Sequence, residues 1–256
     1  MNLLFLGSGG SMGVPVIGCK CVVCLSSSSY NKRFRPSILI TFNEKKYLID
    51  IGPDYRTQAL TYQIDSLDGI LLTHTHYDHV GGFDEVRAYT ACEKRPLPCL
   101  LSRNALEDLK IRYPYFFFSN QNQQPGHEKL IFHILEQDQG TVQFEGLPIS
   151  YVSYEQVGMK VNGFVFGPVA YIVDLLEYSD GLFKGLEGVD VLIMSGRSWH
   201  RSRGHLSLKE AIDFSKRCGA KRTYFTHICH EIEHAETSQR LPEAFFLAYD
   251  GLQLMV

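Results

Sequence analysis

The sequence predicts an α+β fold in which two mixed β-sheets pack face to face and helices cover their outer sides. Short apolar runs of strand length recur in both halves of the chain, and a few amphipathic patterns of helix length lie between them. Two strand-rich halves with few helices bury their apolar faces best as two packed sheets with helices outside. No linker divides the 256 residues, so we expect one domain over residues 1–256.

The predicted strands are short segments rich in Ile, Leu, Val and aromatic residues. In chain order they are 2–6, 37–42, 47–50, 69–73, 97–102, 149–154, 164–173, 189–194, 223–226 and 252–256. The predicted helices are 80–91, 104–111 and 207–218. The last is the clearest, because Ser207 and Glu210 have the spacing of a capping box and Gly219 follows as a stop signal.

Composition and charge restrict the function. Lys and Arg total 25 against 28 Asp and Glu, a net charge of -3, which argues against a general nucleic-acid-binding surface. No apolar run approaches the roughly 18 residues that span a bilayer, and the first residues lack the basic region of a signal peptide. We therefore expect a cytoplasmic protein without a membrane partner. Its seven cysteines are then first candidates for metal binding rather than for disulfides.

An aromatic run at residues 113–118 precedes a polar stretch. It is interpreted in one of two ways. Either the rings pack under their own loop, or they form a substrate lid or the contact of a homodimer.

The strongest functional signal is a cluster of three histidines and an aspartate in residues 73–80, directly after an apolar strand. His74 and His76 are two residues apart and share a face in extended geometry, whereas Asp78 and His79 enter a turn. One short loop can thus offer two pairs of ligands to two divalent ions, with Zn²⁺ and Mn²⁺ both suitable. The alternative is a polar turn with surface histidines.

A second cluster contains three cysteines, Cys19, Cys21 and Cys24, within the loop 18–24. Three thiolates this close can hold one Zn²⁺, which needs a fourth ligand for a closed tetrahedron. The alternative is a set of free surface thiols.

The HxHxDH pattern after a strand resembles the metallo-β-lactamase superfamily, whose members are metal-dependent hydrolases with a four-layer αββα sandwich. The resemblance covers nearly the whole chain and implies that Asp174 bridges two metals and that His227 is a further ligand. The glycines at 7–10, the Gly-Val-Pro at 13–15 and the cysteine loop resemble the PhnP type, a phosphodiesterase associated with carbon–phosphorus lyase. That subgroup implies His230 as the fourth ligand of a structural zinc.

The chain departs from the superfamily at one position. A metal-binding histidine is expected near residues 154–156, where this sequence has Glu155 and Gln156. A carboxylate binds Zn²⁺ or Mn²⁺ readily and an amide binds poorly, so Glu155 is the predicted ligand and Gln156 the alternative. The metal held by His74 and His76 is therefore the doubtful one of the two.

A basic loop follows the predicted strand 189–194. Arg197, Arg201 and Arg203 have the charge and fork geometry to bind a phosphate at the start of a helix. The resemblance gives His205 a catalytic role, and a histidine beside the metals can protonate a leaving oxygen as general acid. His200 is a second candidate for the acid, and a solvated basic loop is the alternative.

These features predict a phosphodiesterase that acts on small or cyclic phosphodiesters through a hydroxide activated by two metals, with Asp78 a ligand that also orients the nucleophile. Two alternatives stay open: a thioester or tRNA-processing hydrolase of the same fold, and a non-catalytic zinc protein of a cofactor-biosynthesis type. The acidic net charge and the absence of a long basic arm argue against tRNA.

Overall fold

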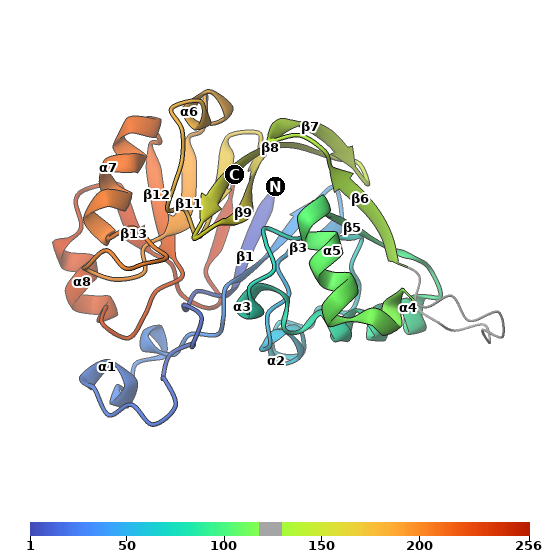
Figure 1. Ribbon diagram of the computed structural model, residues 1–256. Helices are drawn as coiled ribbons and strands as arrows, with labels where there is room; N and C mark the ends of the chain where they lie inside the picture. The colour runs from blue at the N-terminus through green and yellow to red at the C-terminus, as the bar shows by residue number, and fades with distance from the viewer. Residues whose placement is uncertain (118–129) are drawn as a thin grey trace.

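Two β-sheets lie face to face in the computed structural model, which describes residues 1–117 and 130–256 (Figure 1). The first sheet has the order β14 (Gln253–Met255), β1 (Asn2–Gly7), β2 (Ser37–Phe42), β3 (Lys45–Ile49), β4 (Gly69–Leu71), β5 (Leu97–Ser102) and β6 (Leu130–Leu135). The second has the order β13 (Phe245–Leu247), β12 (Arg222–Thr226), β11 (Val191–Ser195), β10 (Val169–Ile172), β9 (Met159–Phe166), β8 (Leu147–Gln156) and β7 (Gln139–Phe144).

Both sheets are mixed, as predicted. In the first sheet β3, β4, β5 and β6 run parallel, and in the second β10, β11, β12 and β13 do so. The remaining pairs are antiparallel. Parallel neighbours bring their carboxyl ends to one edge of a sheet, which is where open α/β sheets place their sites.

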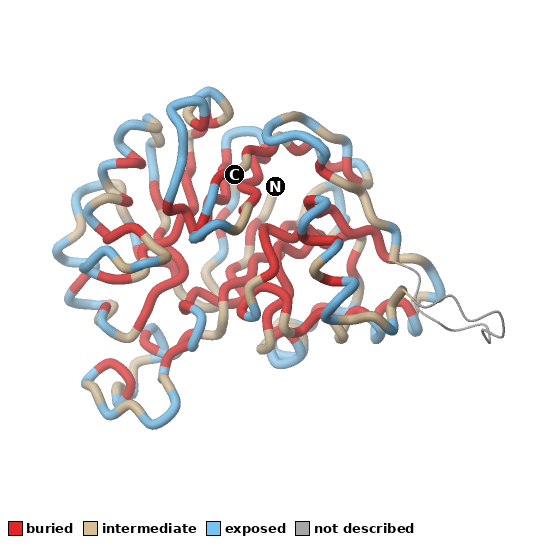
Figure 2. Tube along the Cα trace, viewed as in Figure 1, coloured by how far each residue is buried: buried red, intermediate tan, exposed pale blue. Residues whose placement is uncertain are grey.

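Helices cover the outer face of each sheet, so the layers follow the order helix, sheet, sheet, helix (Figure 1). The helices are α1 (Val22–Leu25), α2 (Tyr55–Thr61), α3 (Tyr77–Val80), α4 (Val86–Glu93), α5 (Arg103–Arg112), α6 (Leu182–Gly185), α7 (Leu208–Cys218) and α8 (His234–Arg240). Single 3-10 turns are formed by Ser29–Asn31, Phe83–Glu85 and Pro114–Phe116. Figure 2 shows that the buried residues follow the layers between these elements.

The core between the sheets is aromatic. Phe5 and Tyr47 of the first sheet meet Phe144, Phe164 and Tyr171 of the second, and all five are fully or almost fully buried. Burying such large apolar side chains is the main favourable contribution to folding here, and their packing holds the two sheets against each other.

The predicted fold class is confirmed, but strands β6, β7 and β13 and helices α2 and α8 were not predicted, and two predicted elements are divided. The predicted strand 164–173 is two strands, because Gly167 and Pro168 form a turn between β9 and β10. The predicted helix 80–91 is interrupted by Gly81 and Gly82, so α4 begins only at Val86. Helix α7 begins after Ser207 with the predicted capping box and ends at Gly219 in the left-handed conformation.

As far as residue 117, the aromatic run packs against the apolar cluster on the outer face of the first sheet. Tyr113 and Phe116 contact Phe83, and Phe117 stacks on Phe132 of β6. Residue 118 and the polar stretch after it lie outside the described residues. No helix within residues 1–117 and 130–256 is both long and apolar enough to cross a membrane.

Candidate active site

Five chain segments converge where strands of both sheets end. Asp50 follows β3, and the histidine loop 73–79 follows β4. Asp174 follows β10, the basic loop 196–207 follows β11, and His227 follows β12. The site therefore lies at the carboxyl ends of the parallel strands, with ligands from both sheets.

Three of these strand ends have an unusual backbone. Asp50, Asp174 and His227 have φ values of 60°, 56° and 58°, in the left-handed region that side-chain-bearing residues rarely adopt. Each turns the chain sharply at the last strand position, and all three side chains are buried. Such strain persists where the surrounding structure determines it and is concentrated at functional sites.

The central cluster consists of Asp78, His79, Asp174 and His227, whose potential ligand atoms all lie within 4.8 Å of one another. His79 Nε2 is 2.8 Å from Asp174 Oδ2 and 3.3 Å from Asp78 Oδ2. His227 Nε2 is 3.1 Å from Asp78 Oδ2 and 3.3 Å from Asp174 Oδ1. The structure thus brings together the four residues predicted for the second metal site.

The donor set of this cluster fits a divalent metal ion. His79 Nε2 and Asp174 Oδ1 are buried yet have no hydrogen-bond partner among the described residues. Burial opposes the charge on Asp174, but His227 and His79 outweigh it and hold the pKa of this carboxyl well below its usual range. Buried carboxylates and imidazoles with unmatched atoms that face one another are the donors that Zn²⁺ and Mn²⁺ prefer.

The first predicted pair of ligands adjoins the same carboxylate. His74 Nε2 lies 3.4 Å from Asp174 Oδ2 and 3.0 Å from His76 Nδ1. Burial and the neighbouring His79 lower the pKa of His74 well below its usual value, which keeps it in the neutral form that binds metals. Asp174 therefore lies between the two histidine pairs, as the bridging role requires.

Asp50 belongs to the site although the sequence analysis gave it no role. Its Oδ2 lies 2.7 Å from His79 Nδ1, and its carboxylate accepts hydrogen bonds from the amide and hydroxyl of Thr73. A carboxylate on the far nitrogen of a metal-binding histidine fixes the ring and its tautomer. An acidic residue that closes an apolar strand was the available signal.

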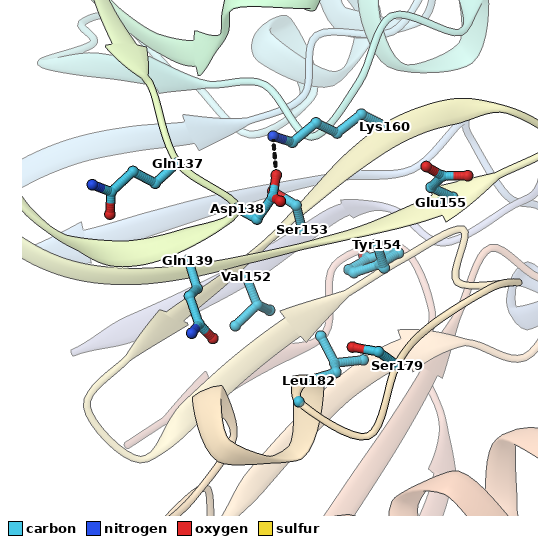
Figure 3. Close-up of a pocket in the computed structure, with 11 residues that line it drawn as sticks. Gln137, Asp138, Gln139, Val152, Ser153, Tyr154, Glu155, Lys160, Ser179 and Leu182 are labelled. Atoms are coloured by element: carbon cyan, nitrogen blue, oxygen red, sulfur yellow. Dashed lines mark hydrogen bonds and ion pairs between the residues drawn. The ribbon is translucent and has the colours of Figure 1, made fainter.

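The structure does not place Glu155, the predicted ligand, in the cluster. Its side chain is exposed and lies beside a pocket of about 400 Å³ that it lines with Lys160 and Ser179 (Figure 3). Gln156 is 3% exposed instead, and its Nε2 donates to Gly204 O at 2.9 Å and lies 3.5 Å from His205 Nδ1. Successive strand residues face opposite ways, so only one of the two can point into the site.

Replacing Gln156 by histidine is expected to raise the metal content, because an imidazole is a far better ligand than an amide. Elemental analysis and Mn²⁺ titration would measure the stoichiometry. Glu155→His is the matched control on the exposed face of β8 and is expected to leave the metal content unchanged. An equal effect of both substitutions would contradict this account of β8.

The predicted site residues of the basic loop lie in different surroundings. His205 Nδ1 lies 3.2 Å from Asp174 Oδ1, and the charge of Arg197 acts on the His205 ring. Arg203 is exposed. Arg201 forms an ion pair with Glu210 at 2.7 Å and lines a pocket beside α7, so its charge is directed to that helix. His200 is also exposed, which leaves His205 as the residue of this loop that contacts the cluster.

The cysteine cluster forms as predicted. His230 Nδ1 lies 3.2 Å from Cys19 Sγ and 3.5 Å from both Cys21 Sγ and Cys24 Sγ. A tetrahedral zinc with Zn–S near 2.3 Å and Zn–N near 2.0 Å places sulfur and nitrogen ligands about 3.5 Å apart. The backbone N–H of Cys24 lowers the pKa of Cys21 to about 6, which favours the thiolate.

The glycines at 7–10 lie against the strand end that carries His227. Gly10 N donates to Ile228 O at 2.9 Å, and a Cβ on Gly10 would lie 3.4 Å from His227 Nδ1. A Cβ on Gly7 would lie only 1.9 Å from Arg35 O, which explains the glycine there.

Comparison with known proteins decides the family. A family model described as a beta-lactamase superfamily domain matches residues 45–228, which include both the histidine loop and His227. The chain belongs to the metallo-β-lactamase superfamily. Within this superfamily it is similar to a crystal structure of a diphosphatase from the PhnP family, with 33% identity and a TM-score of 0.90 over 99% of this chain and 96% of the other.

Two proteins of related sequence are named for other functions. An octanoyltransferase of Porphyromonas gingivalis is 34% identical over 259 residues, 100% of this chain but 52% of the relative, so the chain spans about half of that protein. Coenzyme PQQ synthesis protein B of Methylobacterium radiotolerans is 26% identical over 78% of this chain and 74% of the relative. Relatives that resemble the chain thus differ in named function.

Proposed function

We propose that the chain is a metal-dependent phosphodiesterase that hydrolyses small or cyclic phosphodiesters. The observation that carries the proposal is the contact between His205 and Asp174, because it places a proton donor beside a buried metal-ligand cluster. The positive charge of Arg197 acts on the same ring. The similarity to a PhnP-family diphosphatase over almost the whole chain supports phosphorus chemistry.

Each side chain has a definable task. Two divalent ions held by these ligands would lower the pKa of a water and neutralise charge on a phosphoryl oxygen. The 3.2 Å ion-pair contact of His205 Nδ1 with Asp174 Oδ1 orients the ring, which leaves Nε2 to donate a proton to the leaving oxygen. The charge of Arg197, which acts on the His205 ring, would add positive charge near the leaving oxygen, where negative charge develops.

A non-catalytic zinc protein is the second candidate, because an amide stands where a metal-binding histidine is expected. The complete set of Asp78, His79, Asp174 and His227 favours the enzyme. Elemental analysis of the purified protein separates the two: two or three metals per chain support the enzyme, and a single zinc supports the alternative.

Activity tests the proposal directly. We expect Mn²⁺- or Zn²⁺-dependent hydrolysis of bis(p-nitrophenyl) phosphate and of cyclic nucleotides, and no comparable hydrolysis of an acyl thioester. Hydrolysis of the thioester alone would overturn the phosphodiesterase and support the thioester alternative.

His205→Gln is expected to affect the two phosphodiesters unequally. A nucleoside alkoxide needs a proton to leave, so the rate with a cyclic nucleotide should fall by about 100-fold or more. The p-nitrophenolate ion leaves without one, so the rate with bis(p-nitrophenyl) phosphate should fall far less. His200→Gln, in the same loop but exposed, is the control. Equal losses for both substrates would show that His205 is not the acid.

A further inference from the structure

The hairpin turn between β8 and β9 contains an unusual residue. Gln156 pairs with Met159, so Val157 and Gly158 alone form the turn, with φ values of 49° and 75°. Two-residue turns with positive φ at both positions favour Asn-Gly or Asp-Gly. A β-branched residue in this conformation is a genuine outlier.

Equivalent turns elsewhere in the chain avoid this strain. The turn between β2 and β3 has Asn43 at its first position, with φ 48°, and the turn between β7 and β8 has Glu145, with φ 50°. Both residues are unbranched at Cβ. Val157 is the one β-branched residue with positive φ in the part of the chain that the structure describes.

Packing within the chain does not explain Val157. Its side chain is 64% exposed, and it joins none of the apolar clusters formed by the described residues. A strained backbone of this kind costs about 1–3 kcal/mol and persists mainly at ligand contacts and active sites. An exposed isopropyl group recovers none of that cost by burial unless a ligand covers it.

The turn adjoins the candidate site at two places. On one side, Val157 Cγ2 is 3.8 Å from the position of a Cβ on Gly204, the residue before His205. On the other side, Gly158 lines a pocket of about 230 Å³ together with His74 and Thr75. An organic group of an ester bound at these ligands would therefore lie within reach of this turn.

We propose that Val157 is a specificity-determining residue whose isopropyl group contacts the apolar part of the leaving group beside His205. This inference rests on the proposed phosphodiesterase, because His205 is there the donor to the leaving oxygen. The chemical class it selects is a phosphoester with an apolar or aromatic leaving group. The strained turn holds the side chain outward, where an unstrained Asn-Gly turn would present an amide.

The test compares two anions of equal charge on the metal-loaded full chain. Phenylphosphonate carries an aromatic group next to phosphorus and methylphosphonate does not. Val157→Asn is expected to weaken phenylphosphonate binding by about fivefold, the effect of losing a partly buried isopropyl contact, and to leave methylphosphonate unchanged. The same variant should raise Tm by roughly 2–4 °C because the turn is no longer strained.

Glu145→Asn is the matched control, since it makes the same type of change at the opposite end of the ten-residue strand β8. It should alter neither phosphonate affinity. Unchanged phenylphosphonate binding in Val157→Asn, equal weakening of both anions, or no gain in Tm would each overturn the inference. If the wild-type chain shows the selective binding but hydrolyses no phosphodiester, the proposed function fails while the apolar contact stands.

Discussion

Replacing Asp174 by asparagine is expected to lower phosphodiester hydrolysis by about 100- to 1,000-fold. Asp174 contacts His74, His79, His205 and His227, so it is shared by both predicted metal pairs and by the predicted acid. An amide keeps the shape of the side chain but loses its negative charge, which weakens the binding of two cations and the orientation of the acid. Steady-state rates and the metal content of the same samples would measure both losses.

The control for Asp174→Asn is Asp180→Asn, which removes a carboxylate that is 86% exposed and pairs with Arg217. This variant should retain wild-type rate and metal content. Circular dichroism would show whether each variant is folded. Near-normal turnover of a folded Asp174→Asn protein would rule out the bridging role.

Much of the fold could be predicted because buried strands leave a strong apolar signal. The prediction missed β6, β7 and β13, which all lie at sheet edges. It also merged β9 with β10 across Gly167 and Pro168. Edge strands are only half buried, so their sequences differ little from those of loops. Helices α2 and α8 were missed for a similar reason, because short, mostly exposed helices show weak periodicity.

The site was predictable to the extent that its ligands are adjacent in sequence. The histidine loop and the cysteine loop could be read directly, whereas Asp174 and His227 required the resemblance, since each is a single polar residue at a strand end. The choice between Glu155 and Gln156 depended on strand register, and a shift of one residue reverses which side chain faces inward. Asp50 contacts the predicted ligand His79 from a position 29 residues away in the chain, and its one sequence signal was its place after an apolar strand.

The second large effect is expected on stability. Cys21→Ser should lower Tm by roughly 10 °C. Structural zinc contributes about 10 kcal/mol or more to the folding of small domains. Even a third of that contribution, at roughly 3 °C per kcal/mol for a chain of this size, gives this shift. The apolar cluster around the three cysteines has only three buried members, Val14, Val23 and Cys24. So small an apolar core cannot hold the loop without the metal.

The matched control is Cys92→Ser, an exposed cysteine outside the cluster, which should leave Tm unchanged. A strong chelator should lower the Tm of the wild-type chain toward that of Cys21→Ser and have little further effect on this variant. Because His230 lies three residues beyond His227, loss of zinc should also loosen the strand end that carries an active-site ligand. Activity should therefore fall in Cys21→Ser at temperatures well below its Tm. A variant that loses zinc but keeps both its Tm and its activity would show that the cysteine cluster supports neither the fold nor the site.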